Sequence, residues 1–451
     1  MLQTYLYSHK IRIIHKYKVS IMIRKYINKF KDHAGAQRYT KNVSWMFFSR
    51  MFTLLVSFLT MLYISRVLGP TNFGELDYAL AVIGVFGIIG SWGIEGVLNR
   101  ELIKYPEKHN EIIGTASTLR LILGAVATII VIIFAVFSNI DQISKILLII
   151  LSFTYTISTF SILQQTFLAK AESKYPSIIT AIITLVTNIA KVIIIFTGKG
   201  IIYLAAIMVI ESLLSALLYF LAYTLKLNGK PSEWTFSTTF ARLFIKTGGA
   251  VAFLGMFAMI YSRIDQIMIR NMLDATAVGL YSAGVRLVDL WGFIPMIIGS
   301  ALYPAVLNAR KNSEYLYLKR LQKLFLLYSL PAIIIAVIVS IGAKPLILFI
   351  YGDKFITGFQ ALQIYIWSLP GTFIGFFVMN ILFTDDHRKV LVLTTAFPAI
   401  VNILLNLLWI PIYGIIGAAW ATTISYSLIP IIPLLFKKTR AILYTVYKPQ
   451  Q

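Results

Sequence analysis

Long apolar runs constrain the fold of this chain more than any other feature of its sequence. A helix needs roughly 20 mostly apolar residues to cross the hydrocarbon core of a bilayer. Of the 451 residues, 58% are hydrophobic and only 13% are charged, which leaves too little polar surface for large water-soluble domains. The sequence therefore predicts an all-α integral membrane protein with about twelve transmembrane helices. The predicted helices cover residues 43–65, 78–98, 112–137, 145–168, 177–197, 201–225, 249–269, 280–306, 320–350, 358–384, 389–410 and 415–436.

The distribution of basic residues predicts the orientation of these helices. The chain has 41 Lys and Arg against 18 Asp and Glu, an excess that can indicate nucleic-acid binding. Here, however, the basic residues lie between the apolar runs rather than in one patch. With both termini in the cytoplasm, and the first and last four residues of each span counted with the adjacent loop, 30 of them fall in the tails and even-numbered loops, five in the odd-numbered loops and six inside helices. Since cytoplasmic loops are enriched in Lys and Arg, we predict a multi-pass protein of the cell (plasma or inner) membrane with cytoplasmic termini and no nucleic-acid partner.

Short stretches recur in corresponding places in the two halves of the sequence. Residues 68–74 read LGPTNFG and residues 273–279 read LDATAVG, with Leu, Thr and Gly matched at an offset of 205. Residues 188–202 and 402–416 both place an Asn twelve residues before Gly-Ile-Ile, at an offset of 214. Six helices in each half would insert both halves the same way round. The repeats therefore predict two six-helix lobes related by a pseudo-two-fold axis along the membrane normal, with a cavity between them.

The spans and repeats divide the chain into five regions. These are a basic cytoplasmic N-terminal tail (1–42), an N-terminal six-helix lobe (43–225), a cytoplasmic linker (226–248), a C-terminal six-helix lobe (249–436) and a cytoplasmic C-terminal tail (437–451). The N-terminal tail holds ten Lys and Arg and a single acid, Asp32, without the apolar core of a signal peptide. It is either a plain basic tail or a helix lying on anionic lipid headgroups, with membrane lipids as its partner.

Several kinds of chemistry are absent from the sequence. The chain has no cysteine, and its five histidines all lie outside the apolar runs. No Gly-rich phosphate-binding loop of the nucleotide-hydrolysing type occurs. We therefore expect no metal site, no organic cofactor and no ATP hydrolysis. The external loops are too short to build an enzyme site, so the chain is not predicted to be an enzyme.

Charged side chains inside the predicted spans are the candidate functional residues. Each costs at least ~2.5–3.5 kcal/mol at a helix centre, so a charge that persists there usually faces a cavity or a partner. Near a helix end a lysine or arginine can instead extend its charge to the interface. The cationic candidates are Arg50, Arg120, Lys191, Arg263 and Arg286, and the acidic candidates are Glu211, Asp265 and Asp289.

Helices 7 and 8 carry the most informative of these charges. Arg286 and Asp289 are three residues apart, share a helix face and can pair. Arg263 and Asp265 point in different directions, so each needs a partner on another element. One interpretation is a purely structural network between the two helices. The other places the arginines at the cavity, where their planar guanidinium groups would bind phosphate oxygens.

Helix 2 has a glycine at every third position. These glycines allow close helix packing, or they loosen the helix so that it can act as a hinge. The hinge candidates are Gly84, Gly87, Gly90, Gly93 and Gly96.

Five short motifs follow one another along the predicted spans: RVLGPTNFG (66–74), RIDQ (263–266), AVGLYSA (277–283), YG (351–352) and YGIIGAA (413–419). In their order and spacing they resemble the motifs of a known family, the polysaccharide flippases of the multidrug/oligosaccharidyl-lipid/polysaccharide superfamily, which export O-antigen, capsule and teichuronic acid. The similarity extends over about residues 38–436.

The resemblance implies a flippase that moves a polyprenyl-diphosphate-linked oligosaccharide repeat unit between leaflets by alternating access. It implies an anionic lipid-linked cargo in a cationic cavity, and a glycan polymerase or ligase of the same pathway as a further partner. On this interpretation Arg50, Arg120, Lys191, Arg263 and Arg286 bind the headgroup, and Glu211, Asp265 and Asp289 couple transport to H⁺ or Na⁺ or tune the arginines. Arg263 and Asp265 lie on a matching motif, whereas the other residues rest on charge burial alone.

Three alternatives stay open at this point. A multidrug antiporter of the same superfamily would take cationic drugs and favour an acidic cavity. A membrane glycan polymerase or ligase would need longer external loops. A scaffold that only organises glycan assembly would tolerate neutral substitution of its buried charges.

Overall fold

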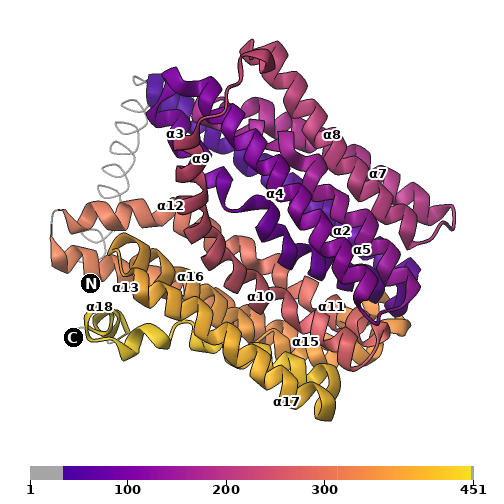
Figure 1. Ribbon diagram of the computed structural model, residues 1–451. Coiled ribbons are helices and arrows are strands. Elements are labelled where there is room, and N and C mark those ends of the chain that lie inside the picture. Colours follow the sequence, from indigo (N-terminus) through magenta and orange to yellow (C-terminus); the bar gives the residue numbers. More distant parts are fainter. Residues whose placement is uncertain (1–33, 312, 448–451) are drawn as a thin grey trace, which may run out of the picture.

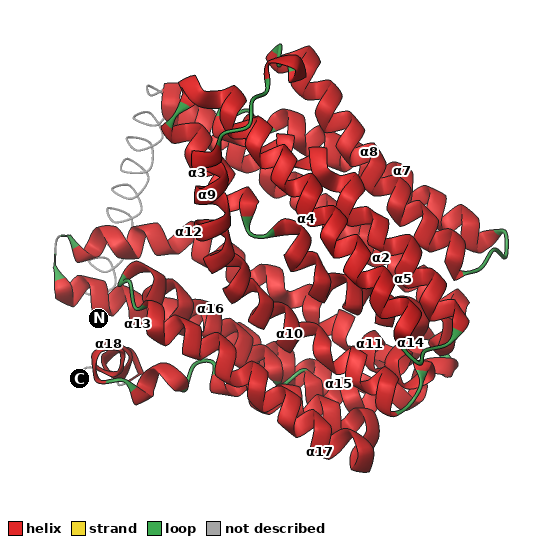
Figure 2. Cartoon of the chain, in the orientation of Figure 1, coloured by secondary structure: helices red, strands yellow, loops and turns green. Residues whose placement is uncertain are grey.

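The computed structural model describes residues 34–311 and 313–447, and in this part of the chain every element is a helix (Figure 2). The predicted all-α class is therefore confirmed. Most of the predicted N-terminal tail, residues 1–33, lies outside the described residues, as do residues 448–451 of the predicted C-terminal tail. The proposed surface helix in the N-terminal tail stays a prediction.

The helices form two lobes that lie side by side (Figure 1). The N-terminal lobe contains α2 (Ala34–Ser91), α3 (Ile94–Lys104), α4 (His109–Phe137), α5 (Gln142–Ile157), α6 (Gln164–Ala169), α7 (Lys174–Phe196) and α8 (Ile201–Leu227). A segment with the short helix α9 (Thr238–Leu243) leads to the C-terminal lobe. This lobe contains α10 (Gly249–Met272), α11 (Ala275–Asp289), α12 (Phe293–Arg310), α13 (Glu314–Ile341), α14 (Ala343–Tyr351), α15 (Phe359–Tyr365), α16 (Ser368–Thr384), α17 (Arg388–Leu428) and α18 (Lys437–Tyr447).

The long helix α2 is two spans joined at one glycine. Gly69 has φ 72° and ψ 173°, a backbone conformation that favours glycine, and Pro70 follows at the start of the second segment, where its missing N–H is tolerated. Ile64 and Leu76, on opposite sides of this break, belong to one buried cluster. The chain therefore reverses at Gly69 and crosses the bilayer twice.

The helix α17 is divided in the same way at Gly414, which has φ 60°. Asn402 donates to the Thr422 hydroxyl at 3.2 Å across the break, so the two segments run side by side. The described residues contain nine helices that are long and apolar enough to cross a membrane, and the bent pair of Asp353–Tyr365 with Ser368–Thr384 adds a tenth span. Because α2 and α17 each cross twice, residues 34–447 as described contain twelve spans, as the sequence predicts.

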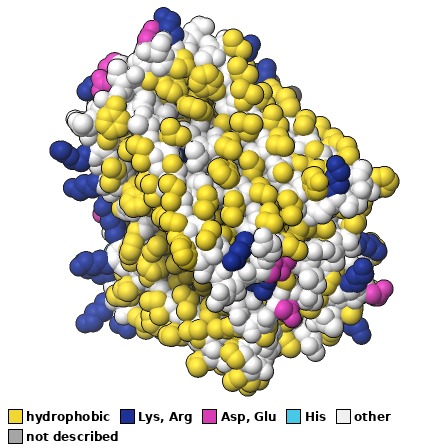
Figure 3. Space-filling model, turned by 45° about the vertical axis from the view of Figure 1, so that its right-hand side comes forward, with side chains coloured by type: hydrophobic (Ala, Val, Ile, Leu, Met, Phe, Trp, Pro, Cys, Tyr) yellow, Lys and Arg dark blue, Asp and Glu magenta, His cyan; other side chains and the backbone are white. Residues whose placement is uncertain are grey.

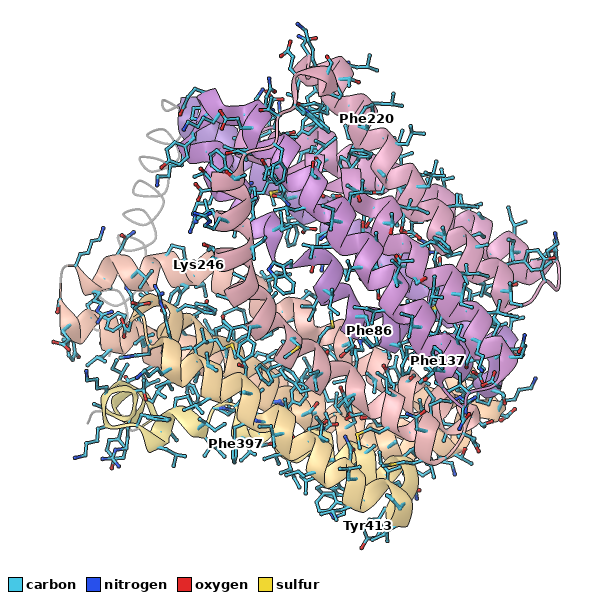
Figure 4. The ribbon with its side chains drawn as sticks, in the orientation of Figure 1. Phe86, Phe137, Phe220, Lys246, Phe397 and Tyr413 are labelled. Carbon is cyan, nitrogen blue, oxygen red and sulfur yellow. The ribbon has the colours of Figure 1, made fainter. Side chains whose placement is uncertain are left out.

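The outer surface of the lobes is largely apolar. Figure 3 shows a broad area of hydrophobic side chains, with Lys and Arg gathered mainly at its edges. On α17 the side chains of Phe397 and Tyr413 are 49% and 59% exposed, and Figure 4 shows them on the outer edge of the C-terminal lobe. So much exposed apolar surface is stable only against lipid.

The two lobes touch at one end of the molecule, called the closed end from here on. There the second segment of α2 meets the start of α11. The hydroxyl oxygens of Thr71 and Thr276 are 2.9 Å apart and share a hydrogen bond. These two threonines are the residues that the internal repeat matches at an offset of 205.

Two glycines make the close approach of the lobes possible. A Cβ at Gly74 would overlap the carbonyl oxygen of Ala275, and a Cβ at Gly279 would overlap the carbonyl oxygen of Pro70. Residues 70 and 74 correspond to residues 275 and 279 at the same offset of 205. The contact is therefore symmetric, and the pseudo-two-fold axis passes between the lobes at this point.

The threonine pair offers a direct test of the closed end. Because the chain has no cysteine, Thr71→Cys with Thr276→Cys introduces the only two thiols. We expect the double variant to form a disulfide in oxidised membranes, since the two side chains already meet. Mobility on non-reducing gels measures the cross-link, and each single variant is the control. A double variant with reactive but unlinked thiols would contradict the contact.

Candidate functional site

A cavity of about 490 Å³ lies between the two lobes and is called the central cavity here. Its volume falls within the range of small-molecule sites. Both segments of α2 line it from the N-terminal lobe, and α10 and α11 line it from the C-terminal lobe. The lining residues are Thr53, Leu54, Ser57, Phe58, Met61, Leu62, Asp77, Leu80, Ala81, Gly84, Met259, Arg263, Arg286, Asp289 and Leu290.

The two arginines of the central cavity are paired with two aspartates. Arg286, on α11, forms an ion pair with Asp77, on the other lobe. The Nη2 of Arg263, on α10, lies 3.7 Å from a carboxylate oxygen of Asp289. The expected pairing of Arg286 with Asp289 along one helix face is thus replaced by two pairings between helices. Gln266 also donates to Asp77, at 3.1 Å.

The lining charges of the central cavity cancel, which differs from the expected cationic surplus. Asp77 causes the difference. The predicted helix 2 starts at residue 78 and leaves Asp77 in a loop, whereas the second segment of α2 begins at Pro70. Neither arginine uses all of its donors: Arg286 Nε is buried without a hydrogen-bond partner among the described residues, and the Arg263–Asp289 pair is too long for a hydrogen bond. The cavity therefore offers guanidinium donors that are held in place but incompletely used.

Asp265 lies outside the central cavity, in a buried polar cluster with α17. Its side chain accepts hydrogen bonds from Asn406 and from Tyr281, both at 2.6 Å, and from Thr422. The residue is only 3% exposed, and within the described part of the chain it forms no ion pair. As the sequence analysis expects, Asp265 finds its partners on other elements. Neutral donors hold its carboxyl group, an arrangement that could bind a proton or a small cation.

The remaining charged candidates are spread over the N-terminal lobe. Lys191 on α7 pairs with Glu211 on α8 at 2.6 Å, and Arg120 on α4 lies 3.3 Å from Glu95 on α3. Arg50 is exposed and lines a separate pocket between α2, α7 and α12. The structure therefore brings together Arg263, Arg286 and Asp289 at the central cavity, and Lys191 with Glu211 in the N-terminal lobe, but leaves Arg50, Arg120 and Asp265 apart from both groups.

The glycines of helix 2 have different surroundings. Gly84 lines the central cavity, while Gly87 and Gly90 lie against Tyr155. The bend follows them: Trp92 has φ 46° and Gly93 has φ 65°, and α3 begins after this turn. Nothing lies within 4 Å of a Cβ placed at Gly96. Gly87 and Gly90 therefore allow close helix packing, whereas the helix is broken only at Trp92 and Gly93.

A cluster of charges at the closed end was missed by the sequence analysis. Arg270, at the end of α10, pairs with Glu75 at 3.0 Å and also with Asp141, just before α5. Burial raises the pKa of Asp141, but the Ser144 amide and the Arg270 guanidinium outweigh it, so the pKa lies below its ordinary value. A carboxyl with a lowered pKa stays ionised as the pH falls until that pKa is reached, so this link between the lobes persists throughout the neutral range.

The sequence around this cavity matches a known protein family. The family described as "Polysaccharide biosynthesis protein" matches residues 39–310. The chain belongs to this family. The matched region contains every residue that lines the central cavity, together with both sides of the closed end. The membership confirms the resemblance seen in the sequence motifs.

One relative of this chain is described as "Putative O-antigen transporter" and comes from Shigella flexneri. The two are 26% identical over 319 residues, which cover 66% of this chain and 74% of the relative. An uncharacterized membrane protein of Haemophilus influenzae is 22% identical and matches 86% of this chain and 93% of its own length.

Solved structures of two transporters share the fold. The lipid II flippase MurJ, in an inward closed conformation, has a TM-score of 0.67 and 18% identity, with 90% of each chain covered. An inward-facing multidrug resistance transporter of the MATE family has the same TM-score at 12% identity, covering 88% of this chain and 96% of its own. At these identities the likeness is one of fold. It supports the two-lobe transporter architecture.

Proposed function

We propose that this protein is a flippase that moves a polyprenyl-diphosphate-linked oligosaccharide repeat unit from the cytoplasmic to the outer leaflet of the cell membrane for surface polysaccharide assembly. The central cavity carries the proposal, because Arg263 and Arg286 face one space between two lobes of a polysaccharide-family chain. The role is transport rather than catalysis. A glycan polymerase or ligase of the same pathway would receive the cargo.

The chemistry of the arginines suits a diphosphate. A guanidinium offers several N–H donors in one plane, and hydrogen bonds between a guanidinium and phosphate oxygens are strong because both groups are charged. Arg286 Nε is buried without a hydrogen-bond partner in the described part of the chain, and Arg263 lies 3.7 Å from Asp289, too far for a hydrogen bond. An anionic headgroup between them would gain contacts with both arginines.

Arg286 connects cargo binding to the contact between the lobes. Its partner, Asp77, belongs to the N-terminal lobe and is only 3% exposed. A diphosphate that binds Arg286 competes with Asp77 and weakens one link between the lobes. Cargo would thereby bias the molecule toward opening at the closed end, which is what alternating access requires.

The charge distribution indicates which side of the membrane the closed end faces. Under the positive-inside rule the closed end, with few basic residues in its loops, faces outward. The described conformation would then be sealed toward the outside. Locking the closed end with the Thr71→Cys and Thr276→Cys pair should accordingly stop transport, and a reductant should restore it.

The cluster around Asp265 is the proposed coupling site for H⁺ or Na⁺, with Asp289 and Glu211 as further carboxylates that tune the arginine and lysine beside them. Asp265→Asn keeps the size of the side chain and removes its charge. Since coupling between sites is typically worth ~1–3 kcal/mol, we expect the acceleration by an ion gradient, roughly five- to hundredfold, to disappear in this variant. Asp353→Asn, an exposed carboxyl after α14, is the control. A variant that still responds to the gradient would exclude Asp265.

The function is tested with purified protein in liposomes. A fluorescent polyprenyl-diphosphate oligosaccharide is included, and an impermeant quencher reports how much of it reaches the outer leaflet, with and without proton or sodium gradients. Movement that depends on the protein is expected. Gradient-driven efflux of a cationic dye without movement of the lipid would instead favour a multidrug antiporter.

A further inference from the structure

A second polar pocket lies inside the N-terminal lobe, next to the central cavity. It has a volume of about 440 Å³ and is called the lobe pocket here. It is lined by both segments of α2, by the end of α5 and the turn that follows it, and by α7 and α8. Thr53 and Leu80 line both the lobe pocket and the central cavity, so the two spaces share a wall.

The lining of the lobe pocket is rich in hydroxyl groups. Eight of its fourteen lining residues are Ser or Thr, and Glu211 adds a carboxylate. Such a density of hydroxyls is not needed to pack helices in a membrane, where one or two small polar residues suffice. The hydroxyls therefore call for an explanation beyond packing.

At least three of the eight hydroxyls of the lobe pocket present acceptors rather than donors. Ser158 donates to the Tyr155 carbonyl at 3.2 Å, Ser161 to the Ser158 carbonyl at 2.6 Å, and Ser212 to the Met208 carbonyl at 3.2 Å. A hydroxyl has one hydrogen, so each of these oxygens keeps only its lone pairs for a ligand.

Glu211 adds to this acceptor surface. One of its oxygens accepts from Lys191 at 2.6 Å, and the other makes no hydrogen bond within the described part of the chain. Because Lys191 already neutralises the carboxylate, the pair has little attraction for a further cation. A ligand with several uncharged N–H or O–H donors fits this wall better.

We propose that the lobe pocket is the subsite for the first sugar of the cargo, and that it takes a neutral or N-acetylated sugar. The inference rests on the proposed flippase function. In a polyprenyl-diphosphate glycan the first sugar is bonded directly to the phosphate, so a sugar subsite must adjoin the arginines. The shared wall at Thr53 and Leu80 meets that requirement, and the hydroxyl and N–H donors of a sugar match the acceptors of the pocket.

The test compares two probes in the liposome assay. One is a fluorescent short-chain polyprenyl diphosphate, and the other is the same lipid carrying a single N-acetylglucosamine. The test variant combines Ser158→Ala, Ser212→Ala and Ser215→Ala, which remove three lining hydroxyls. The control variant combines Ser152→Ala and Thr187→Val, whose hydroxyls also bond to their own helices at 2.7 and 2.8 Å but do not line the pocket.

We expect the test variant to raise the half-saturating concentration of the glycosylated probe by about tenfold or more, since each lost hydrogen bond weakens binding several-fold. Movement of the sugar-free probe should stay at the wild-type level, and the control variant should handle both probes normally. An unchanged half-saturation for the glycosylated probe would overturn the subsite while leaving the flippase function intact. Equal, sodium-dependent losses for both probes would also overturn it, in favour of a cation site. If wild-type protein moves neither probe, the flippase function itself fails.

Discussion

Replacing Arg286 with Gln should lower the affinity for the lipid-linked cargo by about tenfold to a hundredfold, because hydrogen bonds to charged groups contribute roughly 1.5–3 kcal/mol. The arginine lies at the central cavity and forms an ion pair with Asp77, and its buried Nε has no hydrogen-bond partner among the residues that the structure describes. Leaving Asp77 buried without its partner would also destabilise the fold. The variant is therefore made together with Asp77→Asn, which keeps a neutral polar pair across the lobes.

The single variant Asp77→Asn separates binding from closure. It leaves Arg286 without its competitor, so the cargo should bind at least as tightly as in the wild type, while the contact between the lobes is weakened. Initial flipping rates at increasing cargo concentration give both quantities. Wild-type affinity in the Arg286→Gln, Asp77→Asn double variant would show that the arginine does not hold the headgroup.

The sequence predicts the number and order of the membrane spans well because both depend on hydropathy alone. Each span must bury its backbone in its own helix, so the number and order of spans follow from the apolar runs. The repeat at an offset of 205 also pointed to a real contact. Thr71 and Thr276 occupy corresponding positions of the repeat, and in the structure their hydroxyl groups share a hydrogen bond. A symmetric dimer-like contact between two halves naturally pairs corresponding residues.

The partners of the charged residues were not predictable in the same way. The spacing of Arg286 and Asp289 places them on one helix face, but Arg286 lies nearer to Asp77, more than 200 positions away in the sequence. Pairing between lobes depends on how whole helices dock, which no local pattern encodes. The boundary of helix 2 has the largest effect on the predicted charge of the cavity. The predicted helix starts at residue 78, eight residues after Pro70, so Glu75 and Asp77 are assigned to a loop and the cavity is predicted to be cationic.

Adding a methyl group at Gly74 or Gly279 should abolish transport. A Cβ at either position overlaps a backbone carbonyl oxygen of the opposite lobe, at Ala275 or Pro70. Backbone atoms cannot move aside as a side-chain end can, and overpacking of this kind costs about 1–3 kcal/mol or more. The closed state would therefore lose roughly tenfold to a hundredfold of its population relative to the open state.

The helix itself should not suffer from these substitutions. Both glycines lie inside helices, where alanine is favoured over glycine by about 1 kcal/mol, so a loss of transport in Gly74→Ala or Gly279→Ala reports on the contact between the lobes. Gly96→Ala is the matched control, because it gains the same helical preference and its Cβ meets no atom within 4 Å. The yield of the disulfide between Thr71→Cys and Thr276→Cys measures closure in the same variants. If that yield and the flipping rate both stay at the wild-type level in Gly74→Ala, the lobes do not need this close approach. If both fall together while Gly96→Ala is unaffected, closure of this end is a required step of the transport cycle.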